Sequence, residues 1–108
     1  MKLNSKKCTA CRVGAPKLKA NEIIAYSKEV DKDWKVIKNH HIERKFNFKD
    51  FKSALNFTNK IGNLCEREGH HADIHLSWGR VKVIIYTHKI NGLHENDFIL
   101  AAKTDQIK

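Results

Sequence analysis

Two pairs of strand-like segments constrain the fold more than any other feature of the sequence, because the connection within each pair is very short. The first pair is Trp34–Lys38 and Ile42–Phe48, in which apolar and polar residues alternate. The second pair is Ile74–Trp78, with apolar residues at alternate positions, and Val81–Thr87, which is rich in β-branched residues. Parallel strands need a crossover connection of roughly a dozen residues or more, so both pairs must be antiparallel.

Helical patterns lie before, between and after the two strand pairs. Apolar residues recur at three- and four-residue steps over Lys49–Glu68, and the following Gly69 suits the left-handed residue that ends such a helix. Shorter helices are predicted over Glu22–Val30 and Glu95–Ile107. The order of these elements predicts an α+β fold of the αββαββα type, a four-stranded antiparallel sheet with three helices on one face.

The positive charge of the chain is concentrated near its start. The net charge of the chain is +9. Residues 1–19 hold six bases and no acid, and residues 20–108 hold the other 15 of the 21 bases and all 12 acids. We therefore expect residues 1–19 to be a basic N-terminal arm and residues 20–108 to be a single folded domain. Such an arm is usually a solvated terminus, so direct nucleic-acid binding is not expected.

The composition excludes several classes of protein. With 41% hydrophobic residues, 31% charged residues and one proline, the chain is unlike long disordered or collagen-like sequences. No apolar run approaches the ~18 residues of a membrane helix, and no apolar segment follows Met1–Lys7 to form a secretory signal. An odd number of cysteines is typical of a reducing compartment, so we expect a cytoplasmic protein that does not engage a membrane.

Histidine is unusually frequent in the second half of the chain. Four of the seven histidines fall between His70 and His88. If the second hairpin is centred on Gly79, His88 faces His70; if Gly79-Arg80 forms the turn, His88 faces His71. Directly opposed Cβ atoms lie only ~5 Å apart, so the three imidazoles are expected to converge in either register. Imidazoles give and take protons near neutral pH, so the cluster predicts acid–base catalysis or ligand binding.

Simpler interpretations stay open for neighbouring residues. Asp97 can orient one imidazole, or it can stabilise the start of its own helix as a first-turn acid. Glu66 lies on the solvent side of the long helix, and His40 and His41 are expected to be turn residues. Cys8-x-x-Cys11 has the spacing of a zinc knuckle, but no second pair follows at a usual interval, so no metal site is expected.

Several short motifs, spread over nearly the whole chain, together form one pattern. They are Glu66-x-x-x-His70-His71, Trp78, Tyr86-Thr87-His88, Gly92-Leu93 and Asp97, preceded by Cys11-Arg12, Ala15-Pro16-Lys17, Trp34, Ile42-x-Arg44-x-Phe46-x-Phe48 and Phe51. Together they resemble the signature of the pterin-4a-carbinolamine dehydratase family, bacterial type. Two positions depart from the family pattern: Ala72 replaces the usual proline after the histidine pair, and His94 replaces a Thr or Ser helix cap.

The resemblance implies a function and roles for the named residues. Family members remove water from 4a-hydroxytetrahydropterin to give quinonoid dihydropterin, which supports tetrahydrobiopterin recycling for aromatic amino acid hydroxylases. His88 is expected to be the general acid, His70 the base or its partner, and His71 a second acid–base and pterin-binding group. Asp97, Glu66 and Trp78 would bind or orient the substrate.

The resemblance also implies how the protein is assembled and what it works with. We expect no metal or other cofactor, a homodimer or homotetramer, and a functional link to phenylalanine hydroxylase. Some family members also act as dimerisation cofactors for transcription factors, so the alternative is a non-enzymatic regulatory module that binds another protein.

Overall fold

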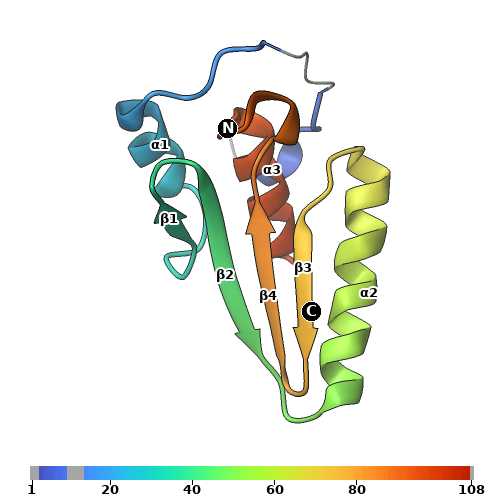
Figure 1. Cartoon of the computed structure of the whole chain (residues 1–108). Coiled ribbons are helices and arrows are strands. Elements are labelled where there is room, and N and C mark those ends of the chain that lie inside the picture. The colour runs from blue at the N-terminus through green and yellow to red at the C-terminus, as the bar shows by residue number, and fades with distance from the viewer. Residues whose placement is uncertain (1–2, 10–13, 108) are drawn as a thin grey trace.

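The computed structural model describes residues 3–9 and 14–107 and shows three α-helices with a four-stranded antiparallel sheet (Figure 1). This confirms the predicted αββαββα order, to which the structure adds two short 3-10 helices. In chain order the elements are η1 (Leu3–Ser5), α1 (Ala20–Ser27), β1 (Lys35–Ile37), β2 (His41–Asn47), α2 (Phe51–Glu68), β3 (Asp73–Ser77), β4 (Arg80–Ile85), η2 (His88–Ile90) and α3 (Glu95–Thr104).

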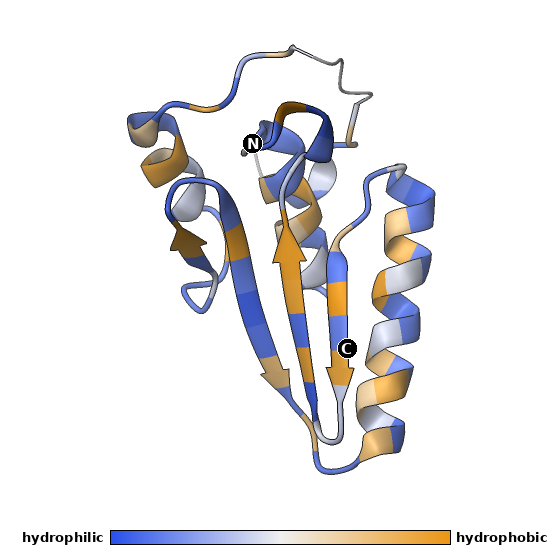
Figure 2. Cartoon of the chain, viewed as in Figure 1, coloured by the Kyte–Doolittle hydropathy of each residue, from blue (hydrophilic) through white to orange (hydrophobic). Residues whose placement is uncertain are grey.

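The sheet has the strand order β1-β2-β4-β3, so the two hairpins meet through the pairing of β2 with β4. Along β4, Val81, Val83 and Ile85 are fully buried and alternate with Arg80, Lys82 and Ile84, which are exposed or half-buried. Figure 2 shows that the upper part of this strand is continuously hydrophobic. Helices α2 and α3 pack on the face that carries these side chains, and α1 packs against α3. The hydrophobic core therefore lies between one face of the sheet and the helices.

Local capping interactions fix where the helices begin and end. The Asp50 carboxylate accepts a hydrogen bond of 2.8 Å from the Ser53 N–H, so α2 begins at Phe51, two residues later than expected. Gly69 ends α2 in the left-handed conformation, with φ 64°, as predicted. Helix α1 starts earlier than expected, at Ala20, and α3 ends at Thr104 rather than Ile107.

The second hairpin has a register that differs from both expected ones. Ser77 pairs with Arg80, so the turn consists of Trp78 and Gly79, and the pairing ends at Asp73 with Ile84. The left-handed φ of 69° at Gly79 favours glycine, and an added Cβ would lie 3.1 Å from the Phe48 carbonyl oxygen. The ladder therefore includes His75 but does not extend to His70, His71 or His88.

Residues 3–9, the first described part of the expected basic arm, pack against the folded domain. Leu3 is only 3% exposed and belongs to the core, and η1 packs against α3. Lys6 forms an ion pair of 2.7 Å with Glu95 at the start of α3. Residues 3–9 are thus part of the folded body and pack against α3.

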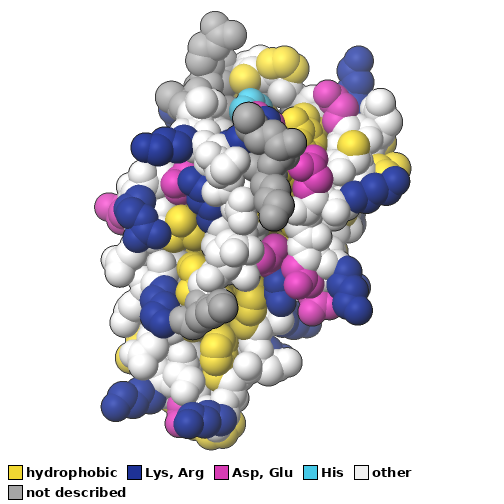
Figure 3. Space-filling model, turned by 180° about the vertical axis from the view of Figure 1, so that it is seen from behind, with side chains coloured by type: hydrophobic (Ala, Val, Ile, Leu, Met, Phe, Trp, Pro, Cys, Tyr) yellow, Lys and Arg dark blue, Asp and Glu magenta, His cyan; other side chains and the backbone are white. Residues whose placement is uncertain are grey.

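Charged side chains are mixed over the surface that lies behind the view of Figure 1. Lys and Arg side chains lie scattered around the rim of this face, with Asp and Glu side chains between them (Figure 3). Among the described residues, the positive charge on this face therefore forms no single broad patch of the kind that a phosphate backbone needs. Within residues 3–9 and 14–107, no helix combines the length and apolar character that crossing a membrane requires.

Candidate active site

Three histidines line one small cavity next to the ends of α2 and β4. The cavity has a volume of about 280 Å³ and is lined by Thr9, Gly69, His70, His71, Thr87, His88 and Lys89. His70 and His71 follow directly after the left-handed Gly69, whereas His88 begins η2 after the end of β4. The imidazoles thus meet through the helix cap and η2, not through cross-strand pairing.

His70 is held by the most buried carboxylate of the site. Its Nε2 lies 2.6 Å from Oδ1 of Asp97, a residue with no exposed surface. The other oxygen, Oδ2, accepts hydrogen bonds from the Thr87 hydroxyl at 2.9 Å and the His94 N–H at 2.8 Å. Asp97 therefore serves both interpretations of the sequence: it stabilises the start of its own helix, and it orients an imidazole.

The same aspartate explains how His94 can replace the usual helix cap. Nδ1 of His94 accepts a hydrogen bond of 3.1 Å from the Asn96 N–H, while Asp97 accepts from the His94 N–H. The two interactions form a reciprocal capping box, the arrangement that Ser or Thr usually makes with Glu. The start of α3, and with it Asp97, is therefore fixed in place.

His71 and Glu66 form a second histidine–carboxylate pair at the rim of the cavity. Nε2 of His71 is hydrogen-bonded to Oε2 of Glu66, which lies on the last turn of α2. Both side chains are mostly exposed, at 59% and 77% respectively. This pair is therefore less strongly held than His70 with Asp97, because solvent screens it.

His88 is positioned by a ring contact more than by a hydrogen bond. Its Nε2 lies 3.7 Å from Oδ1 of Asp73, longer than a hydrogen bond, and its side chain is 53% exposed. The His88 ring packs on Tyr86, with ring centroids 4.3 Å apart. On Tyr86 there is a second ring contact, with His40 at 4.7 Å.

The first hairpin supplies His40, the last ring in the series His88, Tyr86 and His40. His40 lies in the β1–β2 turn as expected, but His41 is already the first residue of β2. Nε2 of His40 lies 2.7 Å from Oδ1 of Asn91, and its Nδ1 lies 3.0 Å from Nδ1 of His41. His40 therefore links the first hairpin to the segment that follows His88.

The hydrogen bonds determine which ring nitrogens can serve a ligand. A carboxylate only accepts hydrogen bonds, so Nε2 of His70 carries a proton when it faces Asp97. The Nδ1 of neutral His70 then holds the lone pair and can accept a proton from a bound molecule. The same reasoning leaves Nδ1 of His71 as the nitrogen that is not used by Glu66.

Trp78 lies apart from the other residues that the sequence places in the site. It occupies the β3–β4 turn, at the opposite end of both strands from the histidines, and it is 72% exposed. Within one chain, Trp78 therefore does not contribute to the histidine cavity.

Cysteine and metal chemistry find little support in the described residues. Cys11, and with it the Cys8-x-x-Cys11 pair, lies outside the described residues. Residues 3–9 and 14–107 contain no group of three or more His, Cys, Asp or Glu side chains arranged to hold a metal ion. Burial, with a contribution from Glu68, raises the pKa of Cys8 to about 12, and burial also raises the pKa of Cys65, so neither is a reactive thiolate.

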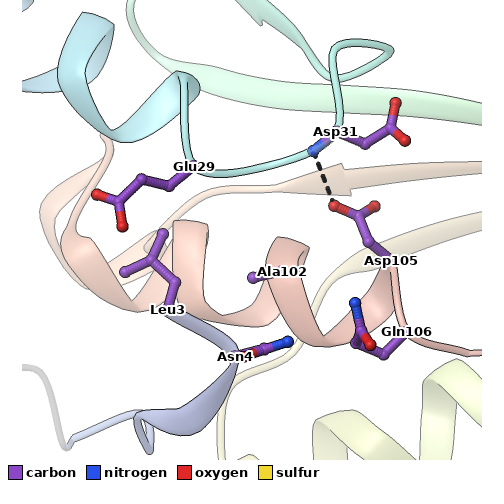
Figure 4. Close-up of a pocket in the computed structure, with 7 residues that line it drawn as sticks. All are labelled: Leu3, Asn4, Glu29, Asp31, Ala102, Asp105 and Gln106. Carbon is purple, nitrogen blue, oxygen red and sulfur yellow. Dashed lines mark hydrogen bonds between the residues drawn. The ribbon is translucent and has the colours of Figure 1, made fainter. Parts of the chain in front are cut away.

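A larger cavity exists elsewhere, but its chemistry is poorer. It has a volume of about 540 Å³ and lies between η1, the end of α1 and the end of α3 (Figure 4). Its carboxylate Asp105 is already bound to the Asp31 N–H, the Trp34 indole N–H and the Arg44 guanidinium. Because burial raises the pKa of Asp105 and these partners occupy it, Asp105 is not free for acid–base work. The other two carboxylates of the cavity, Glu29 and Asp31, are exposed to solvent, and no histidine among the described residues lines the cavity.

The sequence did not predict the contacts that several residues make in the site. Thr87 is the buried donor to Asp97, and Asp73 is the acid nearest His88. A polar residue at the end of the apolar segment Val81–Tyr86 was the available signal for Thr87. Thr9 and Lys89 carry no such signal, because each is one polar residue among many.

Comparisons with known proteins show the family of the chain. The family model for Pterin 4 alpha carbinolamine dehydratase matches residues 16–107. A putative pterin-4-alpha-carbinolamine dehydratase from Alkaliphilus metalliredigens is 54% identical over 96% of this chain and 94% of its own length. A protein of the same description from Rubrobacter xylanophilus is 42% identical over 97% of each chain.

A solved structure shows the same fold. It is a transcriptional coactivator/pterin dehydratase from Brucella melitensis, which superposes with a TM-score of 0.76 at 30% sequence identity and covers 82% of this chain and 95% of its own. With the model match over most of the chain and relatives similar over nearly its full length, the chain belongs to the pterin-4a-carbinolamine dehydratase family.

Proposed function

We propose that this protein is a 4a-hydroxytetrahydropterin dehydratase that works by histidine acid–base catalysis. The observation that carries the proposal is the cavity in which His70, His71 and His88 meet, with His70 held by the buried Asp97. The names of the relatives give the substrate class, a pterin carbinolamine. A neutral pterin ring fits a cavity whose lining is mostly polar but carries few fixed charges.

The reaction needs two proton transfers on neighbouring atoms of the ring. The bond between C4a and its hydroxyl oxygen breaks, and the hydroxyl leaves as water after taking a proton. The proton on N5 is removed, and its electron pair forms the new C4a–N5 double bond of quinonoid dihydropterin. One proton is delivered and one is taken up, so the reaction is balanced without an oxidant or reductant.

The geometry supports a division of these steps between two histidines. His70 is the base for N5, because Asp97 fixes the proton on Nε2 and leaves Nδ1 as the acceptor. His88 is the acid for the hydroxyl, since it reaches the cavity from the other side, on η2. His71, paired with Glu66, is the second acid–base and pterin-binding group.

The departure at Ala72 is compatible with this function. The Ala72 N–H donates a hydrogen bond of 3.5 Å to the Cys65 sulfur, an interaction that proline cannot make. This contact ties the segment after the histidine pair to α2. The alanine therefore replaces part of the rigidity that proline gives the family.

The biological setting follows from the chemistry and stays part of the proposal. We propose a cytoplasmic enzyme that returns the oxidised pterin of an aromatic amino acid hydroxylase to the tetrahydrobiopterin cycle. We further propose a homo-oligomer, dimer or tetramer, whose mass light scattering in solution can measure. Trp78 can take part in the site only if another copy of the chain brings it there.

The decisive experiment follows the ultraviolet absorbance of freshly made 4a-hydroxytetrahydropterin as it dehydrates, with and without the protein. We expect dehydration to be faster with the protein, in proportion to its concentration. An unchanged rate at micromolar protein would contradict the proposal.

A second candidate is a non-enzymatic role in binding another protein. Phe51 and Leu55 on α2 are 44% and 38% exposed, and apolar side chains of this size are typical of helix contacts. The related protein from Brucella melitensis is described as a transcriptional coactivator as well as a pterin dehydratase. A protein that leaves the dehydration rate unchanged would favour this second role.

A further inference from the structure

We propose that the N-terminal segment of residues 3–9 forms a wall of the histidine cavity at Thr9, and that this wall determines affinity for the C6 substituent of the pterin. The inference rests on the proposed function, since it names the part of that substrate which the wall recognises. It assigns a specificity-determining role to Thr9, whose hydroxyl is not an acid–base group near neutral pH.

The first observation is the position of Thr9. It lines the same cavity as His70, His71 and His88, although more than 60 residues separate it from the nearest of them in the sequence. The histidines supply the proton-transfer groups, which must surround C4a and N5 of the ring. Thr9 is therefore left to contact a part of the ligand that does not react.

The second observation is how firmly Thr9 is anchored. The Thr9 N–H donates to Oδ1 of Asn96 at 3.0 Å, and Nδ2 of Asn96 donates to the Thr9 carbonyl oxygen at 2.6 Å. Asn96 is only 2% exposed, and its side chain makes both of these hydrogen bonds to the backbone of one distant residue. A buried amide used in this way fixes the position of that backbone.

A neighbouring contact holds the segment from the other side. The Cys8 N–H donates to Oε1 of Glu68 at 3.0 Å, and Oε2 of Glu68 accepts from Lys103 at 2.7 Å. Residues 8 and 9 are therefore clamped between the end of α2 and the start of α3. These are the two places from which His70 and Asp97 enter the site.

The wall and the catalytic imidazole share one attachment point. Asn96, which holds Thr9, directly precedes Asp97, which holds His70. Both residues lie in the first turn of α3, so the distance from the wall to the imidazole is set by rigid helix geometry. A ligand that fills the space between them is thereby selected by its size.

The chemistry of a pterin separates the wall from the proton-transfer groups. The family model, which begins at residue 16, contains His70, His71, His88 and Asp97. Thr9 precedes residue 16, but the relatives from Alkaliphilus metalliredigens and Rubrobacter xylanophilus match 96% and 97% of this chain, so the segment around Thr9 has a counterpart in them. The reacting atoms C4a and N5 belong to the ring that all pterins share, whereas the C6 substituent varies, so a wall residue without a proton-transfer role is suited to recognise the substituent.

The test weakens the anchor without touching the histidines or Asp97. Asn96→Ala removes both side-chain bonds to Thr9, and Thr9→Pro removes the Thr9 N–H at an exposed position, where a folding defect is not expected. Thr104→Ala is the matched control, because Thr104 is a buried polar residue of the same helix, and its hydroxyl donates only to the Leu100 carbonyl oxygen. Alkylation of Cys8, measured in a Cys11→Ser background, reports whether the segment has detached.

Two substrates distinguish recognition of the substituent from recognition of the ring. We expect both anchor variants to raise KM about five-fold for the 4a-hydroxy form of tetrahydrobiopterin, the size of one lost hydrogen bond. In Asn96→Ala, KM for the 6-methyl analogue and kcat for both substrates should change less than two-fold, and in Thr9→Pro the KM for the 4a-hydroxy form of tetrahydrobiopterin should rise more than KM for the 6-methyl analogue. Cys8 should be alkylated faster in the anchor variants than in Thr104→Ala.

The outcomes separate this inference from the proposed function. The proposed role of the wall is overturned if Cys8 is alkylated faster in the anchor variants while the ratio of KM values for the two substrates stays unchanged. It is also overturned if neither anchor variant changes the rate of Cys8 alkylation. If the unmodified protein does not accelerate dehydration, the proposed function fails. The wall is then judged by the ratio of Kd values for 7,8-dihydrobiopterin and its 6-methyl analogue, and absence of any binding overturns it as well.

Discussion

His70 and Asp97 are 27 residues apart in the sequence, yet Nε2 of His70 lies 2.6 Å from Oδ1 of Asp97. Asp97 is fully buried, and its second oxygen is occupied by the Thr87 hydroxyl and the His94 N–H. The carboxylate therefore has a fixed orientation, and so has the imidazole that donates to it. This pair joins the end of α2 to the start of α3 at the floor of the site.

Replacing Asp97 with asparagine tests whether this orientation matters for the chemistry. Asp97→Asn keeps the side-chain shape but offers an amide that can donate as well as accept, so the proton on His70 is no longer fixed at Nε2. We expect kcat to fall roughly 10²-fold or more while KM changes little. Nitrogen NMR of His70 should show the change of tautomer, and a kcat within three-fold of the unmodified enzyme would contradict the role of Asp97.

Removal of the proton-transfer groups should have a larger effect on rate than on stability. We expect His70→Ala and His88→Ala each to lower kcat by about 10²–10⁴-fold, the usual contribution of a positioned acid or base. His75→Ala is the control, since His75 is an exposed residue of β3 outside the cavity. Circular dichroism should show that all three variants are folded, and full activity in both site variants would overturn the assignment.

The contact between Tyr86 and His88 predicts a difference between two substitutions. Tyr86→Phe keeps the ring that packs 4.3 Å from His88, so we expect kcat to stay within about two-fold. Tyr86→Leu removes the ring and frees a half-exposed imidazole to rotate, so kcat should fall about ten-fold at nearly constant KM. Equal rates in the two variants would show that the ring does not position His88.

Much of the fold follows from patterns that are local in the sequence. Helix α2 was predicted from its apolar spacing, and its end from Gly69, because a left-handed residue is needed there. The antiparallel pairing followed from the shortness of the turns. These features depend on neighbours within a few residues, which is why the sequence alone is sufficient for them.

The predicted register of the second hairpin was wrong, although the sequence contains information that argues against one of the two expected registers. Ile74 and Leu76 must share the inner face with Val81 and Val83, which rules out a turn centred on one residue. Trp78 continues the alternation of Ile74 and Leu76 in the sequence, so both expected registers counted it as a strand residue. It is in fact an exposed turn residue, and Gly79 takes the left-handed position after it.

The packing of the N-terminal segment could not be predicted from charge. Its contacts are single hydrogen bonds to residues far along the chain, such as Thr9 to Asn96. Such pairs leave no periodic pattern, and six bases in 19 residues suggest a solvated arm instead. The same holds for the link from Thr87 to Asp97, which depends on the tertiary fold.

Acid should release the N-terminal segment, because two carboxylates hold it. For Glu68, burial acts to raise the pKa, but hydrogen bonds from Lys103 and the Cys8 N–H outweigh it and hold the pKa below its usual 4.5. For Glu95, the hydrogen bond from Lys6 lowers the pKa, against a smaller opposing effect of burial. Both carboxylates thus bind protons less tightly in the folded state, and the stability that they contribute is present above pH 4.5 and lost as pH falls through their folded pKa values.

We therefore expect the free energy of unfolding to fall as the pH is lowered from 5 to 3, and Glu68→Gln to reduce this fall. At pH 7 the variant should be less stable by about 1 kcal/mol, since a charge-assisted bond becomes a neutral one. Urea unfolding at several pH values measures the change, and Cys8 alkylation in a Cys11→Ser background follows the segment itself. Glu29→Gln, at an exposed carboxylate, is the control and should leave the slope of stability against pH unchanged. An equal slope in Glu68→Gln and in the unmodified protein would show that Glu68 does not hold the segment.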